Sequence, residues 1–144
     1  MELVILLDGS GSVKSENFET LKTWTNGFIE NLKVHDYGTR VGVIHFATTV
    51  TEISPLSPNV DEIIRKISGI TYNKGVTQTG AALKYAYETT FASARANVPK
   101  IVLVITDGKT TDQGFERNDF YVGGCKRLFL SPLTTAMYGP DFVF

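Results

Sequence analysis

The sequence predicts an α/β fold, with a doubly wound, mostly parallel sheet that is flanked by helices and has one antiparallel edge strand. Residues 3–7 and 101–105 are apolar at every position, which is typical of central strands that are covered on both faces of a parallel sheet. Helical patterns alternate with the strand-like segments, as in doubly wound domains. With 144 residues, the chain is long enough for one such domain.

The first half of the chain supplies one helix and two further strands. Apolar residues recur at helical spacing over residues 16–33 and predict an amphipathic helix. Residues 41–46 predict a second buried strand. Residues 48–53, which are β-branched and alternately polar, follow almost at once. Because this separation is too short for a helical crossover, we expect an antiparallel pair with the third strand at an edge of the sheet.

The second half begins with a break and returns to the buried sheet. Pro55 is expected to interrupt regular structure. A short helix then begins at Asn59, where Glu62 three residues later resembles a capping box. A third helix is predicted over residues 80–93, and the apolar strand of residues 101–105 follows it.

Composition and charge exclude several classes of function. A formal net charge of −1, with 42% apolar and 20% charged residues, is typical of a globular domain rather than a disordered chain. The basic residues are scattered, so we expect neither a nucleic-acid nor a membrane-surface partner. No segment is long and apolar enough to insert into a membrane. The amino terminus lacks a signal-peptide pattern, so we expect any export signal to lie outside this chain or not to exist.

Oxygen-bearing side chains follow two of the predicted central strands. Asp8, Ser10 and Ser12 come directly after the first strand, at alternate positions separated by glycines. Asp107 ends the strand of residues 101–105, and Thr77 lies in a loop that opens a helix. In an open α/β sheet, ligands bind outside the carboxyl ends of the strands. We therefore expect these five side chains to gather at that edge.

Hard oxygen ligands of this kind suit a small divalent cation such as Mg²⁺. Two carboxylates neutralise the charge of the ion, while three hydroxyls add coordination without adding charge. Water is expected to fill the remaining positions. A partly hydrated ion of this kind can accept a carboxylate from another molecule, which is the chemistry of adhesion.

Three motifs in this order resemble the metal-ion-dependent adhesion site of the von Willebrand factor type A domain. They are the Asp-x-Ser-x-Ser sequence of residues 8–12, Thr77 before a helix, and Asp107 after a buried strand. The resemblance covers residues 2–112, and the stretch from Thr77 onward is particularly similar to collagen-binding integrin inserted domains and to matrilin- and collagen-type matrix proteins. It implies that Mg²⁺ or Mn²⁺ is bound by Asp8, Ser10, Ser12, Thr77 and Asp107.

The remainder of the chain departs from the family pattern. The family continues with further strands and a last helix, and residues 113–144 do not match that order. We therefore expect the C-terminal strands and helix to be missing or replaced. On this basis we divide the chain into a von Willebrand A part with the metal site, residues 1–112, and a divergent tail, residues 113–144. Residues 126–130 are the candidate for one substitute strand beside residues 101–105.

The resemblance implies a non-enzymatic adhesion module. Its expected partner is an extracellular matrix or cell-surface protein, with collagen or another matrix protein first, bound through an acidic residue that bridges to the metal. The expected location is extracellular. The alternative is an intracellular von Willebrand A scaffold module in a multiprotein assembly. A phosphoryl-transfer enzyme that uses Asp8 is disfavoured, because Ser10 replaces the second acid and no complete phosphate-cradling Gly-x-x-x-x-Gly-Lys-Ser/Thr motif is present; Gly108-Lys109-Thr110 has Leu103 where the motif needs its first glycine.

Simpler interpretations stand beside these. The Gly/Ser sequence of residues 8–12 would by itself be an ordinary turn. Thr79 is expected to cap a helix rather than to bind metal. His45 is expected to lie in the second strand, packed or exposed at an edge, with no chemical role.

Overall fold

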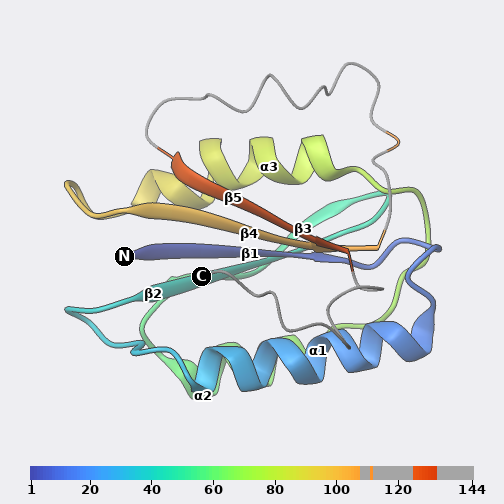
Figure 1. The fold of residues 1–144 in the computed structure, drawn as a ribbon, viewed down its shortest axis with the longest axis horizontal. Coiled ribbons are helices and arrows are strands. Elements are labelled where there is room, and N and C mark those ends of the chain that lie inside the picture. The colour runs from blue at the N-terminus through green and yellow to red at the C-terminus, as the bar shows by residue number, and fades with distance from the viewer. Residues whose placement is uncertain (108–110, 112–124, 133–144) are drawn as a thin grey trace.

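The computed structural model describes residues 1–107 and 111 and, for the backbone, residues 125–132. Its sheet has the strand order β3-β2-β1-β4-β5. Strand β1 (Glu2–Asp8) lies at the centre and pairs in parallel with β2 (Arg40–Phe46) and with β4 (Lys100–Thr106). Helix α3 covers one face of the sheet, and α1 and α2 cover the other (Figure 1). The predicted doubly wound α/β fold is confirmed.

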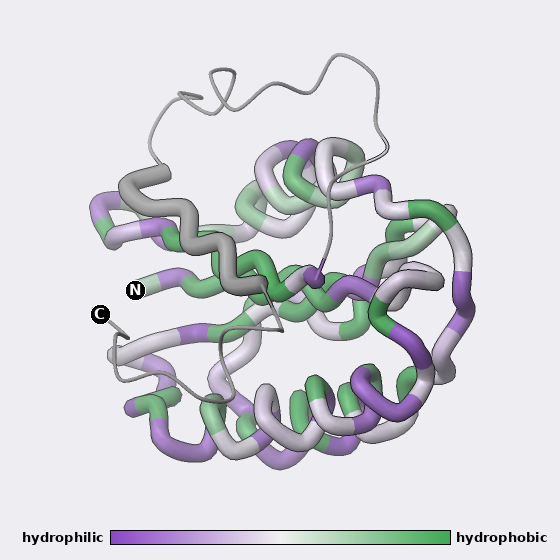
Figure 2. The backbone as a smooth tube through the Cα atoms, turned by 45° about the vertical axis from the view of Figure 1, so that its right-hand side comes forward, coloured by the Kyte–Doolittle hydropathy of each residue, from purple (hydrophilic) through white to green (hydrophobic). Residues whose placement is uncertain are grey.

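The core lies on both faces of the central strand. All seven residues of β1 are buried. Leu3, Ile5 and Leu7 pack on the side of α1 and α2, whereas Val4 and Leu6 pack on the side of α3. The green central strands in Figure 2 show the same apolar layer between two layers of helices. This burial on both faces is the reason for the continuous apolar runs in the sequence.

The helices follow the predicted order with shorter bounds. They are α1 (Ser15–Glu30), α2 (Val60–Ser68) and α3 (Thr79–Glu88), the last followed by a 3₁₀ turn, Thr90–Ser93. The predicted end of the first helix, residue 33, is wrong. The side-chain Nδ2 of Asn31 donates to the carbonyl of Gly27, and the next backbone bond, from Leu32 N–H to Ile29 O, spans three residues instead of four, so the helix ends earlier. The described helices include none that is long and apolar enough to cross a membrane.

The capping box predicted at the start of α2 is confirmed in one of its two bonds, because the backbone N–H of Asn59 donates to Ser57 Oγ at 3.1 Å and not to Glu62. The side chain of Asn59 accepts a hydrogen bond from the backbone N–H of Glu62 at 3.1 Å, as the capping pattern predicts. Thr79 differs from its prediction. It is the first residue of α3 itself, and the preceding residue, Gln78, makes no side-chain cap hydrogen bond.

Strand β3 (Val50–Ser57) pairs antiparallel with β2 and forms an edge of the sheet, as predicted. The expectation that Pro55 interrupts regular structure is wrong, because the strand runs through it. Pro55 is exposed on an edge strand, and the register with β2 shifts in this region. A proline is tolerated at such a position, since its missing N–H removes no necessary ladder bond.

A fifth strand lies beyond β4. The backbone of β5 (Cys125–Pro132) runs parallel to β4, at the position where the sequence suggested a substitute strand. The division of the chain at residue 112 stays a prediction, and the rest of the proposed tail, residues 113–124 and 133–144, lies outside the described residues.

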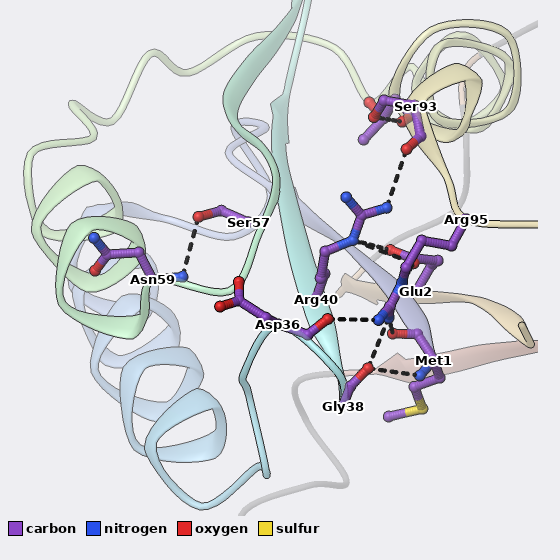
Figure 3. Close-up of polar contacts among 10 residues, drawn as sticks. Met1, Glu2, Asp36, Gly38, Arg40, Ser57, Asn59, Ser93 and Arg95 are labelled. Atoms are coloured by element: carbon purple, nitrogen blue, oxygen red, sulfur yellow. Dashed lines mark hydrogen bonds and ion pairs between the residues drawn. The ribbon is translucent and has the colours of Figure 1, made fainter.

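A buried ionic cluster closes the amino end of the sheet (Figure 3). The fully buried carboxylate of Glu2 pairs with Arg40 at 3.0 Å and also with Arg95. The two guanidinium groups also donate hydrogen bonds to backbone carbonyls, Arg40 to that of Ser93 and Arg95 to that of Gly38. Burial raises the pKa of Glu2, but its bonds and charge interactions with the two arginines outweigh this effect and hold the pKa below its ordinary value.

Candidate metal centre

Three segments meet at the carboxyl ends of β1 and β4, at the right-hand end of the sheet in Figure 1. They are residues 8–12, which begin with the last residue of β1, the loop of residues 71–78 before α3, and Asp107 after β4. Because β1 and β4 are parallel neighbours, their last side chains adjoin. The hydroxyl of Thr106 donates to Asp8 Oδ2 at 2.5 Å.

A continuous chain of polar contacts links four of the five predicted ligands. The backbone N–H of Ser10 donates to Asp8 Oδ1 at 2.8 Å. The hydroxyl oxygens of Ser10 and Ser12 lie 3.0 Å apart, and Ser12 Oγ donates to Asp107 Oδ1 at 2.8 Å. Asp8 and Ser10 are fully buried, whereas Ser12 is exposed. The cluster is therefore reached from solvent on the Ser12 side.

Thr77 lies in the loop that adjoins this cluster. Its side chain is buried, and its carbonyl accepts hydrogen bonds from the backbone N–H and the hydroxyl of Thr111 at 2.8 and 2.9 Å. The same loop contacts the Asp8–Ser12 segment, because Gly11 N–H donates to Gly75 O at 2.9 Å. The structure thus joins Asp8, Ser10, Ser12 and Asp107 by direct hydrogen bonds. It places Thr77 on a loop that contacts residues 8–12 through Gly75 and the chain after β4 through Thr111.

The electrostatics of the cluster favour a bound cation. Burial raises the pKa of Asp8, and the negative charge of Asp107 adds to that rise, while hydrogen bonds from Thr106 and Ser10 oppose it; the net shift is upward. In the described part of the chain, no basic side chain forms an ion pair with either carboxylate. The donors are all oxygen and carry two negative charges, a set that fits Mg²⁺ or Mn²⁺.

Two supporting residues escaped the sequence analysis. Thr106 donates to Asp8, and its place directly before Asp107 is a signal that could have indicated it. The hydroxyl of Tyr72 donates to the carbonyl of Ser10 at 3.1 Å. Nothing in the sequence pattern points to Tyr72, because it lies in an irregular loop and 62 residues separate it from its partner.

His45 is packed beneath the loop, as one of its two predicted placements had it. Its side chain is 3% exposed, and its ring lies 5.3 Å from that of Phe18. A Cβ atom at Gly9 would come within 2.0 Å of His45 Nε2. Gly9 is therefore needed for close packing against His45; its φ is not positive, so the backbone turn itself does not demand a glycine there. Burial and the nearby charge of Lys22 lower the pKa of His45.

Comparisons with known proteins agree with this architecture. The model of the von Willebrand factor type A domain matches residues 2–120. The chain is 37% identical to matrilin-1 of Gallus gallus over 117 residues, covering 78% of this chain and 24% of the relative. It is 38% identical to the collagen alpha-1(XXI) chain of Xenopus laevis over 113 residues, covering 77% of this chain and 12% of the relative. The chain thus spans a quarter or less of these two relatives.

Solved structures show the same fold. Proximal thread matrix protein 1 from the mussel byssus has a TM-score of 0.69 at 26% identity, with 77% of this chain and 31% of that chain covered. The manganese-loaded TRAP protein of Plasmodium vivax has a TM-score of 0.70 at 23% identity, with 78% of this chain and 48% of that chain covered. With its family model matched from residue 2 to residue 120, the chain belongs to the von Willebrand factor type A domain family.

Proposed function

We propose that this chain is a metal-ion-dependent adhesion module that binds an acidic residue of an extracellular matrix protein. The observation that carries the proposal is the oxygen cluster around the buried Asp8, which adjoins a second carboxylate and, in the part of the chain that the structure describes, only neutral donors. A divalent cation would supply the missing positive charge. The residues that would hold it are Asp8, Ser10, Ser12, Thr77 and Asp107.

Each donor has a distinct part in this proposal. Asp8 and Asp107 together neutralise the charge of a divalent ion. Ser10, Ser12 and Thr77 coordinate it without adding negative charge, and the positions that water fills can then be taken by a carboxylate of another molecule. Because Ser12 is the exposed member, a carboxylate of the partner would approach from that side.

The relatives support a matrix partner. Matrilin-1 and the collagen alpha-1(XXI) chain each contain a region similar to this chain, and both are structural matrix proteins rather than enzymes. Their similarity favours an extracellular location, a non-enzymatic role, and a collagen or another matrix protein as partner. The similarity to the manganese-loaded TRAP protein supports the fold that carries the site.

The decisive test combines metal titration with partner binding. Calorimetry with Mg²⁺ and Mn²⁺ should show binding to the wild-type chain and none to Asp8→Ala. Asp61→Ala is the matched control, since Asp61 is an exposed acid in the first turn of α2, away from the site. Binding to immobilised collagens and matrilins should disappear with a chelator and return with Mg²⁺. Unchanged metal affinity in Asp8→Ala, or partner binding that survives chelation, would contradict the proposal.

A further inference from the structure

We propose that Tyr72 is a positioning residue for the metal site, an inference that rests on the proposed function. Tyr72 acts on one peptide group, the unit between Ser10 and Gly11. The carbonyl of this unit accepts a hydrogen bond from the Tyr72 hydroxyl at 3.1 Å. Its N–H donates to the carbonyl of Gly75 at 2.9 Å. The loop of residues 71–78 therefore holds both polar ends of a single peptide, and we call this pair of bonds the peptide clamp.

The clamped peptide lies between two of the proposed ligands. Ser10 precedes it and Ser12 follows one residue later, so a rotation of this rigid plane would move both hydroxyls. Their present contacts depend on that orientation, since the two hydroxyls lie 3.0 Å apart and Ser12 bonds to Asp107. One hydrogen bond would leave the plane free to turn about it, whereas bonds at both ends fix the plane.

The bond from Tyr72 ties the Ser10 carbonyl to a different loop from the one that contains Ser10. The carbonyl of Ser10 also accepts the N–H of Val13 at 3.2 Å, but Val13 belongs to the same turn and would move with it. Tyr72 instead connects this carbonyl to the segment that carries Thr77. The position of the Ser10 and Ser12 hydroxyls is thereby set relative to the fifth proposed ligand.

Tyr72 is held by packing outside the site. Its half-buried ring lies 5.6 Å from the ring of Phe18, which is fully buried. Two residues before Tyr72, the carbonyl of Ile70 accepts a hydrogen bond from the buried Lys22 of α1 at 3.0 Å. The hydroxyl therefore projects from an anchored side chain and an anchored backbone, as a positioning group must.

The Gly75 end of the clamp is equally constrained. Gly75 has a φ of 149°, a region that side chains rarely adopt, and a Cβ atom there would come within 2.3 Å of Thr48 Oγ1. Glycine is thus required for the backbone to pass beneath Thr48 and present its carbonyl to Gly11. Contacts with α1 and with the β2–β3 turn fix the two ends of the clamp separately.

The test is Tyr72→Phe, which removes one hydroxyl and keeps the ring. We expect the affinity for Mg²⁺, measured by calorimetry at a temperature where the chain is fully folded, to fall about twofold to tenfold, the equivalent of one net hydrogen bond. Tyr85→Phe is the control, because Tyr85 is a half-buried tyrosine on α3 outside the site. It should leave metal affinity unchanged. A purely structural Tyr72 would lower the melting temperature without altering metal affinity.

A double-mutant cycle tests the coupling between the two loops. If the clamp works by setting the serine hydroxyls relative to Thr77, Tyr72→Phe should weaken Mg²⁺ binding less in a Thr77→Ala background than in the wild type. Equal effects in both backgrounds would overturn that coupling. Wild-type metal affinity in Tyr72→Phe, together with its loss in Asp8→Ala, would overturn the positioning role and leave the proposed function intact.

Amide hydrogen exchange provides a readout that does not depend on metal. The Gly11 N–H is one end of the clamp, so its exchange in the metal-free chain should be several times faster in Tyr72→Phe than in the wild type. Exchange of the Phe18 amide, in α1, should not change. Equal exchange at Gly11 in the two chains would refute the clamp, whether or not the wild-type chain binds metal. Failure of the wild-type chain to bind metal would refute the proposed function, and it would leave this exchange test of the clamp valid.

Discussion

Replacing Asp8 with asparagine should stabilise the metal-free chain while abolishing metal binding. The side chain is fully buried, and its two oxygens accept hydrogen bonds from Ser10 N–H and from the Thr106 hydroxyl. Asparagine has the same shape. Its oxygen can accept from Ser10, and its amide can donate to Thr106, because a hydroxyl is both donor and acceptor. Both contacts therefore survive the substitution, while the buried charge and its repulsion by Asp107 disappear.

The size of the effect follows from what is retained and what is removed. With both hydrogen bonds kept, we expect the free energy of unfolding of metal-free Asp8→Asn to exceed that of the wild type by about 0.5–2 kcal/mol, the usual range for relieving a locally unfavourable group. With Mg²⁺ at about 100 times its dissociation constant, the wild type should gain about 2.7 kcal/mol by linkage. The variant should gain nothing, so the order of stability should reverse.

Urea unfolding in chelator and in Mg²⁺ measures both quantities on the same two chains. The result that would refute this reasoning is a metal-free Asp8→Asn chain that is less stable than the wild type by more than about 1 kcal/mol, because the hydrogen bonds of the carboxylate would then outweigh its burial. Equal stabilisation of both chains by Mg²⁺ would refute the role of Asp8 as a ligand.

Two further substitutions test the packing below the site and the opposite end of the sheet. Gly9→Ala should lower the free energy of unfolding by about 1–3 kcal/mol, since the new Cβ would lie 2.0 Å from His45 Nε2. A free energy of unfolding in urea equal to that of the wild type would contradict this and show that the loop moves to accommodate the methyl group. Glu2→Gln should cost about 3 kcal/mol at pH 7, because Arg40 and Arg95 lose their shared carboxylate. The folded-state pKa of Glu2 is lowered, so its contribution is complete above the ordinary value of 4.5 and is lost as pH falls through the lower folded pKa. The stability difference between wild type and Glu2→Gln should therefore shrink below pH 4.5, and a constant difference down to pH 2 would contradict the assignment.

The sheet could be predicted because its central strands are buried on both faces. The order of β1 to β4 along the chain follows from three features of the sequence. These are the continuous apolar runs, the short separation before the third strand, and the helical spacing of apolar residues between the strands. The boundaries were less accurate where a local contact decided them. Asn31 caps the end of α1 with a side-chain bond to Gly27 O, where the backbone bonding shortens to Leu32 N–H with Ile29 O. Pro55 continues β3 because an edge position needs no donor there. Neither effect is visible in the hydrophobic period.

The site was predictable in part for the same reason. Asp8, Ser10 and Ser12 are close in sequence, and Asp107 joins them because β1 and β4 are parallel neighbours. Tyr72 could not be found in this way, because its bond to Ser10 depends on the path of an irregular loop. His45 looked like an ordinary strand residue, and its contact with Gly9 arises only when the turn folds back over β2. Residues such as these, which contact a loop from distant positions in the sequence, are not marked by hydrophobic spacing or by a motif.

The two ends of β1 provide the strongest internal argument for a cation. Glu2 and Asp8 are both fully buried acids on the same strand. The fold supplies two guanidinium groups to Glu2, and its pKa falls despite burial. At Asp8 the fold supplies neutral donors and a second carboxylate, and the pKa rises. The same strand carries an acid paired with two arginines at its other end. The absence of an ion pair to Asp8 among the described residues is therefore a property of the site and not of burial in general. Among the described residues, the Asp8 end has hydroxyl groups, an exposed approach and no ion pair to either carboxylate, which is where a divalent cation would complete the electrostatics.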